Sequence, residues 1–217
     1  MQNSDPDRKI VALLAKWPEP GHVKTRLGAS IGMETAAAVQ RALVEQTIAL
    51  VPPEFELQIW LSPKEQAAAM TEWLQPKHPN LTFHLQPEGD LGVRLSAVFS
   101  SNAPQSVAAI GADCPTMTVR ELELAFVYLA QNDFVLGPAR DGGYYLIAAR
   151  QPHPALFQNV PWSTNRTRFI TYQQARDAGL QWHELAMLDD LDTIEDWQRL
   201  PPLLRKNLMR RLGKSPE

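Results

Sequence analysis

The sequence is almost free of cysteine, since Cys114 is the only one in 217 residues. A lone thiol excludes an internal disulfide and a zinc site built from several cysteines, and it suits a reducing compartment. The segment from Met1 to Lys9 is polar and has no apolar core of a signal peptide, and no apolar run reaches the length of a membrane span. We therefore expect a cytoplasmic protein with no stable membrane insertion.

A strong net charge is also absent. The chain has 21 basic and 24 acidic residues, which gives a formal charge of -3. No field of one sign would attract a polyanion, so we expect small-molecule substrates as partners and no nucleic acid. Whether the chain is a monomer or a homodimer stays open at this point.

The length and the 44% hydrophobic content allow one well-buried core. No repeat, low-complexity tract or linker interrupts the chain. We expect a single domain over residues 1–217, with a motif-bearing core at 9–197 and a C-terminal amphipathic helix at 203–212. The basic stripe on that helix is typical of a solvated surface and is assigned no chemistry.

Short apolar runs alternate with helical patterns along the chain. Strands are expected at 10–14, 55–61, 81–85, 107–110, 134–136, 144–148 and 182–188. Helices are expected at 33–51, at 62–74 with Ser62 as cap, within 88–101 after an initial loop, at 118–130, and at 166–178 with Ser163 or Thr164 as cap. This alternation is typical of βαβ units and predicts an α/β fold with a parallel sheet.

The loop after the first strand is the most unusual stretch. It reads A-K-W-P-E-P-G-H-V-K-T-R-L and carries Lys16, Lys24 and Arg26. Open α/β sheets bind ligands at the carboxyl ends of their strands, so these cations predict a phosphate site. A solvated basic loop is the alternative. The loop is neither a P-loop nor a G-x-G-x-x-G fingerprint, so side-chain charge would hold the phosphate.

Carboxylates follow other strands of the expected sheet. Asp113 in G-A-D-C-P comes after the fourth strand, where an unpaired charge would avoid burial. Five carboxylates crowd the eight residues from Asp189 to Asp196, and helix capping explains Asp192 with Thr193 but not Asp189 and Asp190. Carboxylates beside a phosphate imply a bridging Mg²⁺ or a similar ion.

Three further residues are open to two interpretations. Asp141 lies on a D-G-G bend, which suits either a backbone approaching a ligand or a plain hairpin. Arg94 is either a contact for a phosphate or base or an ordinary exposed helical arginine. Trp162 either stacks on a base or sugar ring or packs in the core.

Five ordered motifs carry a family resemblance. They are A-K-x-P-x-P-G-x-V-K-T-R-L, G-x-D-C-P, G-P-x-x-D-G-G-Y-x-L-I, W-S-T and D-x-D-T-x-x-D, and they span Val11 to Asp196. Together they resemble an uncharacterised bacterial family of the nucleotide-diphospho-sugar transferase (GT-A) superfamily, which includes glycosyltransferases of the arsenosugar-biosynthesis type. They are more distantly similar to the 2-phospholactate and molybdenum cofactor guanylyltransferases.

The resemblance implies a three-layer α/β/α domain with a mostly parallel sheet of about seven strands. It implies phosphate binding by Lys24 and Arg26, and Mg²⁺ or Mn²⁺ held by Asp113 and Asp192, with Asp190 as the alternative second ligand. Asp141 would be a catalytic base on the acceptor side. Two departures are evident, because the L-x-G-G-x-x-x-R-M-G loop of nucleotidyltransferases is missing and G-A-D offers one aspartate instead of D-x-D.

The expected function is metal-dependent glycosyl transfer from a nucleotide-diphospho-sugar to an unidentified small-molecule acceptor. The alternative is a nucleotidyltransferase that joins a nucleotide to a phosphorylated acceptor with release of pyrophosphate. Arg140, Arg166 and Arg168 are the candidates for holding that second phosphate. A nucleotide-binding module without catalysis is the third alternative.

Overall fold

The computed structural model describes residues 8–212. Seven strands form one sheet in the order β3-β2-β1-β4-β6-β5-β7. The strands are β1 (Lys9–Lys16), β2 (Glu56–Ser62), β3 (Thr82–Leu85), β4 (Ser106–Ile110), β5 (Phe134–Pro138), β6 (Tyr144–Ala149) and β7 (Trp182–Glu184). Only β6 runs antiparallel to its neighbours. The predicted α/β fold with a mostly parallel sheet of seven strands is confirmed.

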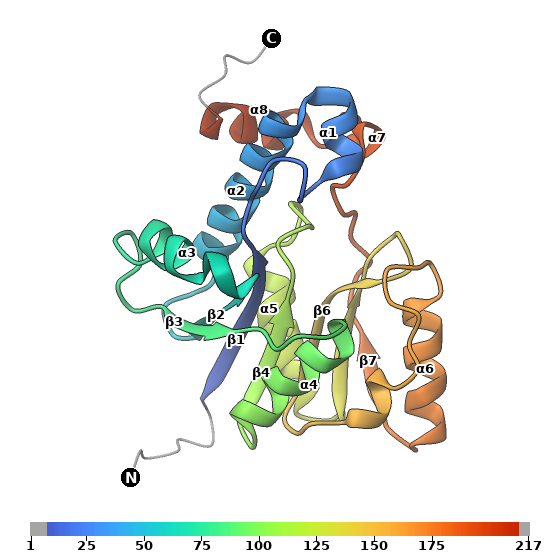
Figure 1. The fold of residues 1–217 in the computed structure, drawn as a ribbon. Helices are drawn as coiled ribbons and strands as arrows, with labels where there is room; N and C mark the ends of the chain where they lie inside the picture. Colours follow the sequence, from blue (N-terminus) through green and yellow to red (C-terminus); the bar gives the residue numbers. More distant parts are fainter. Residues whose placement is uncertain (1–7, 213–217) are drawn as a thin grey trace.

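Helices cover both faces of this sheet (Figure 1). The α-helices are α1 (Thr25–Ile31), α2 (Met33–Leu50), α3 (Ala67–Leu74), α4 (Leu91–Asn102), α5 (Val119–Leu129), α6 (Thr167–Asp177), α7 (Ile194–Arg199) and α8 (Pro202–Arg211). Two short 3₁₀ helices are η1 (Lys64–Gln66) and η2 (Pro154–Phe157). Helices α2, α3 and α5 pack on one face and α4, η2 and α6 on the other, which gives the three layers expected from the resemblance.

The middle of β1 is buried on both faces, because side chains of opposite register enter the two separate cores. Val11 and Leu13 pack with α2 and α5, whereas Ile10 and Ala12 pack with α4 and η2. β1 pairs in parallel with both β2 and β4. The carboxyl ends of these strands therefore point to the same end of the molecule, where Figure 1 shows α1, α7 and α8 together.

Helix α1 was not expected from the sequence, which placed Lys24 and Arg26 in a loop. Lys24 is the N-cap of α1, and Arg26 lies in its first turn. A helix of seven residues carries too little periodicity to be recognised beside the two prolines that precede it. Gly32, with a φ of 89°, separates α1 from α2.

Three other expected boundaries were wrong. Ser62 is the last residue of β2 and caps no helix, since η1 precedes α3 there. The last strand ends at Glu184, because beyond it only Leu188 forms a bridge, with Ala139. Neither Ser163 nor Thr164 occupies the N-cap of α6, which is Arg166, although the Thr164 hydroxyl accepts a hydrogen bond from the Arg166 N–H at 3.2 Å.

Within residues 8–212, no helix is both long and apolar enough to cross a membrane. The polar stretch 1–7 lies outside the described residues. The C-terminal helix is present one residue earlier than predicted, as α8.

Candidate active site

Three backbone hydrogen bonds bring distant segments together at the carboxyl end of the sheet. The Leu191 N–H donates to the Asp113 carbonyl at 2.9 Å. The Leu188 N–H donates to the Pro138 carbonyl, and the Arg140 N–H donates to the Leu188 carbonyl, both at 3.0 Å. The acidic segment therefore lies along the ends of β4 and β5, so that Asp192 lies close to Asp113.

Lys24 joins these two aspartates. Its ammonium donates to Asp113 Oδ1 at 2.5 Å and to Asp192 Oδ1 at 2.8 Å. The Lys24 side chain is 3% exposed, whereas the side chains of Asp113 and Asp192 are 53% and 42% exposed. Of the three cations predicted in the basic loop, Lys24 thus meets both aspartates, as a direct ion pair.

The environment keeps Lys24 charged. Burial by itself would lower the pKa of the ammonium, but the carboxylates of Asp113 and Asp192 outweigh it and raise the pKa above the ordinary value. The Lys24 backbone is left-handed, with a φ of 46°. That conformation is uncommon outside glycine and marks a position where the fold demands an unusual placement.

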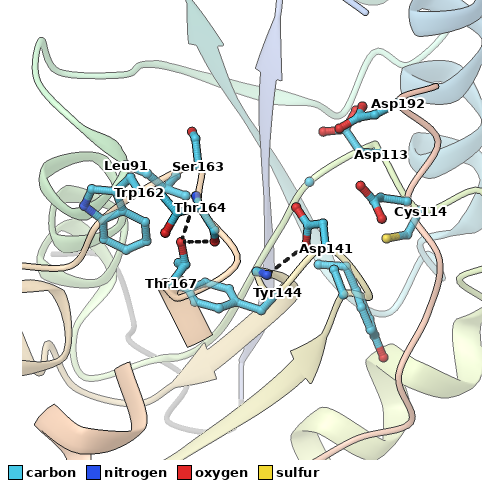
Figure 2. Close-up of a pocket in the computed structure, with 15 residues that line it drawn as sticks. Leu91, Asp113, Cys114, Asp141, Tyr144, Trp162, Ser163, Thr164, Thr167 and Asp192 are labelled. Carbon is cyan, nitrogen blue, oxygen red and sulfur yellow. Dashed lines mark hydrogen bonds between the residues drawn. The ribbon is translucent and has the colours of Figure 1, made fainter. Parts of the chain in front are cut away.

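Beside this ion pair is a cavity of about 250 Å³. It is lined by Leu91, Gly111, Asp113, Cys114, Ala139, Asp141, Gly143, Tyr144, Tyr145, Trp162, Ser163, Thr164, Thr167, Asp190 and Asp192. Figure 2 shows Asp113, Asp192 and Asp141 across the cavity from Trp162, Ser163 and Thr164. The volume lies just below the range of about 300–1,000 Å³ that is typical of sites for drug-sized ligands.

Asp141 is held by the turn that joins β5 to β6. Its carboxylate accepts a hydrogen bond from the Gly143 N–H at 2.8 Å. Gly142 has a φ of 94°, and a Cβ there would lie 2.3–2.7 Å from the Asn165 backbone. The hairpin interpretation of D-G-G is therefore correct, and the same turn places Asp141 in the cavity wall.

Asp190 is a carboxyl of the cavity lining whose pKa departs from its ordinary value. Burial raises its pKa from the ordinary 3.8 to about 6, and the charges of Asp141, Asp192 and Asp196 add to the rise. Ionisation of the Asp190 carboxyl in the folded protein therefore costs free energy, because the charged form is partly buried among other carboxylates.

We predict that Asp190→Asn raises the thermal unfolding midpoint at pH 7 and leaves it nearly unchanged at pH 4. The folded protein binds this proton up to about pH 6 and the unfolded chain only to about 3.8, so Asp190 lowers stability as the pH rises through that window. Melting curves from pH 4 to pH 8 in EDTA measure the effect. An equal shift at every pH would contradict the assignment.

The remaining predicted binding residues lie outside the cavity wall. The Lys16 ammonium donates to the His22 carbonyl at 2.8 Å and so folds back on its own loop. Arg26 is exposed on α1 and forms no ion pair among the described residues. Arg94 donates to Gln86 Oε1 at 3.0 Å and lines a different hollow, with Trp60 and His84.

Gln86 explains the place of Arg94. The Gln86 amide donates to the carbonyl of Trp60 at 2.7 Å and to that of Ala15 at 3.4 Å. Arg94 is thereby tied, through Gln86, to the carboxyl ends of β1 and β2.

The wall opposite the carboxylates was only partly predicted. Trp162 was singled out, and its ring forms an edge contact with Tyr144 at 6.3 Å between centroids. Gly92 makes room for it, because a Cβ there would lie 2.9 Å from Trp162. Ser163 and Thr164 also line this wall, and the W-S-T motif that contains them could have indicated them from the sequence.

Cys114 also lines the cavity but is not suited to act as a nucleophile. Burial raises the pKa of its thiol, and the charges of Asp113 and Asp190 raise it further. The thiol therefore stays neutral near pH 7, and the thiolate is the reactive form.

The two aspartates fit a hard divalent ion. Their Oδ1 atoms converge on a single cation, Lys24 Nζ, and both carboxylates remain partly exposed. No group of three or more His, Cys, Asp or Glu side chains in residues 8–212 is arranged to hold a metal. Mg²⁺ usually takes only one or two protein carboxylates and completes its shell with substrate phosphate and water, so a pair suffices.

A family model described as "Uncharacterized protein conserved in bacteria (DUF2064)" matches residues 36–164, which is more than half of the chain. The chain belongs to this family. Among curated proteins, none matches the chain.

Solved structures resemble this DUF2064 protein over nearly its full length. A candidate nucleotide-diphospho-sugar transferase from Desulfovibrio desulfuricans G20 is 28% identical, covers 97% of this chain and 100% of its own, and has a TM-score of 0.80. This similarity confirms the superfamily inferred from the motifs.

Two more distant structures share the fold at low identity. The inositol-1-phosphate CTP transferase of T. maritima is 10% identical, with a TM-score of 0.59 and coverage of 98% of this chain and 99% of its own. Rv0371C of Mycobacterium tuberculosis H37Rv, solved in complex with manganese, is 13% identical, with a TM-score of 0.54 and coverage of 89% and 97%. At these identities the likeness establishes the fold alone.

Proposed function

We propose that this DUF2064 protein is a metal-dependent glycosyltransferase that takes a sugar from a nucleotide-diphospho-sugar and passes it to a small-molecule hydroxyl. The observation that carries the proposal is the shared cavity edge, where Asp113 and Asp192 meet Lys24 while Asp141 lines the same space. A pair of carboxylates for a metal, a cation for phosphate and a separate carboxylate for a proton are the groups that this chemistry needs.

The charges around the cavity favour glycosyl transfer over nucleotidyl transfer to a phosphorylated acceptor. Its lining includes four aspartates and no lysine or arginine. At an effective dielectric constant of about 20, one like charge at about 5 Å costs about 3 kcal/mol. A second phosphate near Asp141 or Asp190 would therefore be repelled, whereas a neutral hydroxyl would not.

The three arginines considered for that second phosphate do not change this balance. Arg140 is exposed and paired with Asp189. Arg166 is exposed, and Arg168 donates to the Ala139 carbonyl at 3.5 Å. None of the three lines the cavity. The cations of the first loop, Lys16, Lys24 and Arg26, therefore lie together on the β1–α1 side, which suits one phosphate-bearing substrate.

In the proposed reaction, the bond between the anomeric carbon and the terminal phosphate oxygen of the nucleotide breaks, and a bond to the acceptor oxygen forms. Asp141 accepts the proton of the acceptor hydroxyl through its carboxylate. The metal, held by Asp113 and Asp192, would stabilise the negative charge of the departing nucleotide diphosphate. The ring of Trp162 and the hydroxyls of Ser163 and Thr164 would orient the sugar.

A thermal-shift screen tests the donor class. Nucleotide sugars and nucleoside triphosphates are compared with and without Mg²⁺ or Mn²⁺, because a ligand that binds only the folded protein raises the midpoint. We expect stabilisation by nucleotide sugars in the presence of metal. Stabilisation by triphosphates alone would favour nucleotidyl transfer, and binding without any turnover would favour a nucleotide-binding module.

Asp141→Asn tests the proposed base. Loss of a general base typically costs about 10²–10⁴-fold in rate. We expect a loss of this size in kcat with an unchanged midpoint shift for the nucleotide sugar, because Asp141 lies away from the phosphate side. Activity close to that of the wild type would remove Asp141 from the mechanism.

A further inference from the structure

The partners in the Lys24 ion pair differ strongly in solvent exposure. The ammonium is buried behind the two carboxylates, with 3% of the side chain exposed, while Asp113 and Asp192 reach solvent with about half of theirs. A cation that arrives from solvent would thus meet the carboxylates first, on the side away from Lys24.

Lys24 already uses the oxygens that a metal would need. Its Nζ is 2.5 Å from one Oδ1 and 2.8 Å from the other, which is within the space that a metal shared by these two atoms would occupy. Mg²⁺ binds oxygen at about 2.0–2.1 Å. A metal on the second oxygen of each carboxylate would still place a double positive charge close to the ammonium, so the two cations would repel each other.

The backbone conformation of Lys24 also indicates that its contacts with the aspartates hold it in place. Its left-handed conformation at the start of α1 is one that lysine seldom adopts. Strained positions of this kind persist where surrounding contacts enforce them, and here the side chain is fixed by the two aspartates. Release of the side chain would remove that restraint.

We propose that Lys24 is a resident counter-ion of the Asp113–Asp192 pair that a divalent cation displaces, which frees the ammonium for the phosphates of the nucleotide. The inference rests on the metal site of the proposed function and assigns Lys24 two successive partners. Lys24 is on this view a positioning residue that keeps the carboxylates together in the metal-free protein. Metal and nucleotide then favour each other's binding, because each removes a competitor of the other.

Direct Mn²⁺ binding, measured by electron paramagnetic resonance without nucleotide, tests the exchange. Lys24→Met removes the competitor, and we expect it to bind Mn²⁺ at least tenfold more tightly than the wild type. Lys16→Met is the matched control, since it removes the same charge from the same loop without a contact to either aspartate. It should bind Mn²⁺ as the wild type does.

A second measurement uses the unaltered protein, in case Lys24→Met folds poorly without metal. Amine labelling followed by mass spectrometry should find Lys24 protected in EDTA and reactive in Mg²⁺, while exposed Lys16 is labelled equally in both. Equal Mn²⁺ affinity of wild type and Lys24→Met, with Lys24 protected throughout, would overturn the exchange alone.

The outcomes separate the two proposals. Absence of Mn²⁺ binding by both proteins would overturn the exchange together with the metal part of the proposed function. Tighter Mn²⁺ binding by Lys24→Met, combined with no stabilisation by any nucleotide sugar, would support the exchange and reject the glycosyl donor.

Discussion

Asp113→Asn is expected to reduce transfer by about 10²–10³-fold or more, the loss typical when one group that stabilises the transition state is removed. The amide keeps the shape of the carboxylate but loses the charge that both Lys24 and a metal need. Asp192 still pairs with Lys24, so the fold should persist with a loss of about 1–3 kcal/mol in the free energy of unfolding. Turnover and denaturant unfolding measure the two effects separately.

Asp189→Asn is the matched control for this variant. Asp189 belongs to the same acidic segment, but it pairs with Arg140 at the surface and does not line the cavity. Its activity should stay within about twofold of the wild type, because exposed ion pairs contribute little. Comparable losses in the two variants would show that activity depends on the total negative charge near the site and not on the position of Asp113.

Gly142→Ala is expected to destabilise the protein by about 2–5 kcal/mol and to lower activity with it. The left-handed backbone alone costs alanine about 1–2 kcal/mol, and overpacking adds about 1–3 kcal/mol. The new Cβ would lie 2.3–2.7 Å from the Asn165 backbone, and backbone cannot rotate away as a side chain does. The 163–165 turn and Asp141 should therefore shift apart.

Gly179→Ala is the matched control that separates the cost of the left-handed backbone from the cost of steric overlap. Gly179 also has a positive φ, of 69°, but no atom lies within 4 Å of the place of its Cβ. We expect it to lose only the backbone contribution of about 1–2 kcal/mol and to keep full activity. Urea unfolding of both variants tests this, and equal losses would show that the Asn165 contact is unimportant.

The fold was predictable because local signals agree with one another along the chain. Apolar runs such as Ile10–Leu14 and the Thr118 capping box mark elements that the structure contains at nearly the predicted residues. The position of Asp113 at the end of β4 followed from the cost of burying its charge. The sequence did not predict the short helix α1, and it placed the end of the short strand β7 too late, because such short elements depend on tertiary packing.

The pairing within the site was harder to predict. The sequence predicted Lys24 as a phosphate ligand, but it did not predict that the ammonium contacts Asp113, 89 residues away, and Asp192, 168 residues away. Charge type indicates that a lysine seeks an anion but does not say which one is within reach. The partner of Arg94 was equally hard to predict from the sequence, because Gln86 is placed beside it by hydrogen bonds to the ends of β1 and β2.

Analysis of the released nucleotide distinguishes glycosyl transfer from nucleotidyl transfer. The wild type and Asp113→Asn are incubated with Mg²⁺, a panel of nucleotide sugars or triphosphates, and a bacterial small-molecule extract as the source of acceptors, and the released nucleotide is identified by mass spectrometry. We predict that the wild type releases nucleoside diphosphate from at least one nucleotide sugar and that Asp113→Asn does not. Release of pyrophosphate from a triphosphate, with every nucleotide sugar left intact, would contradict it.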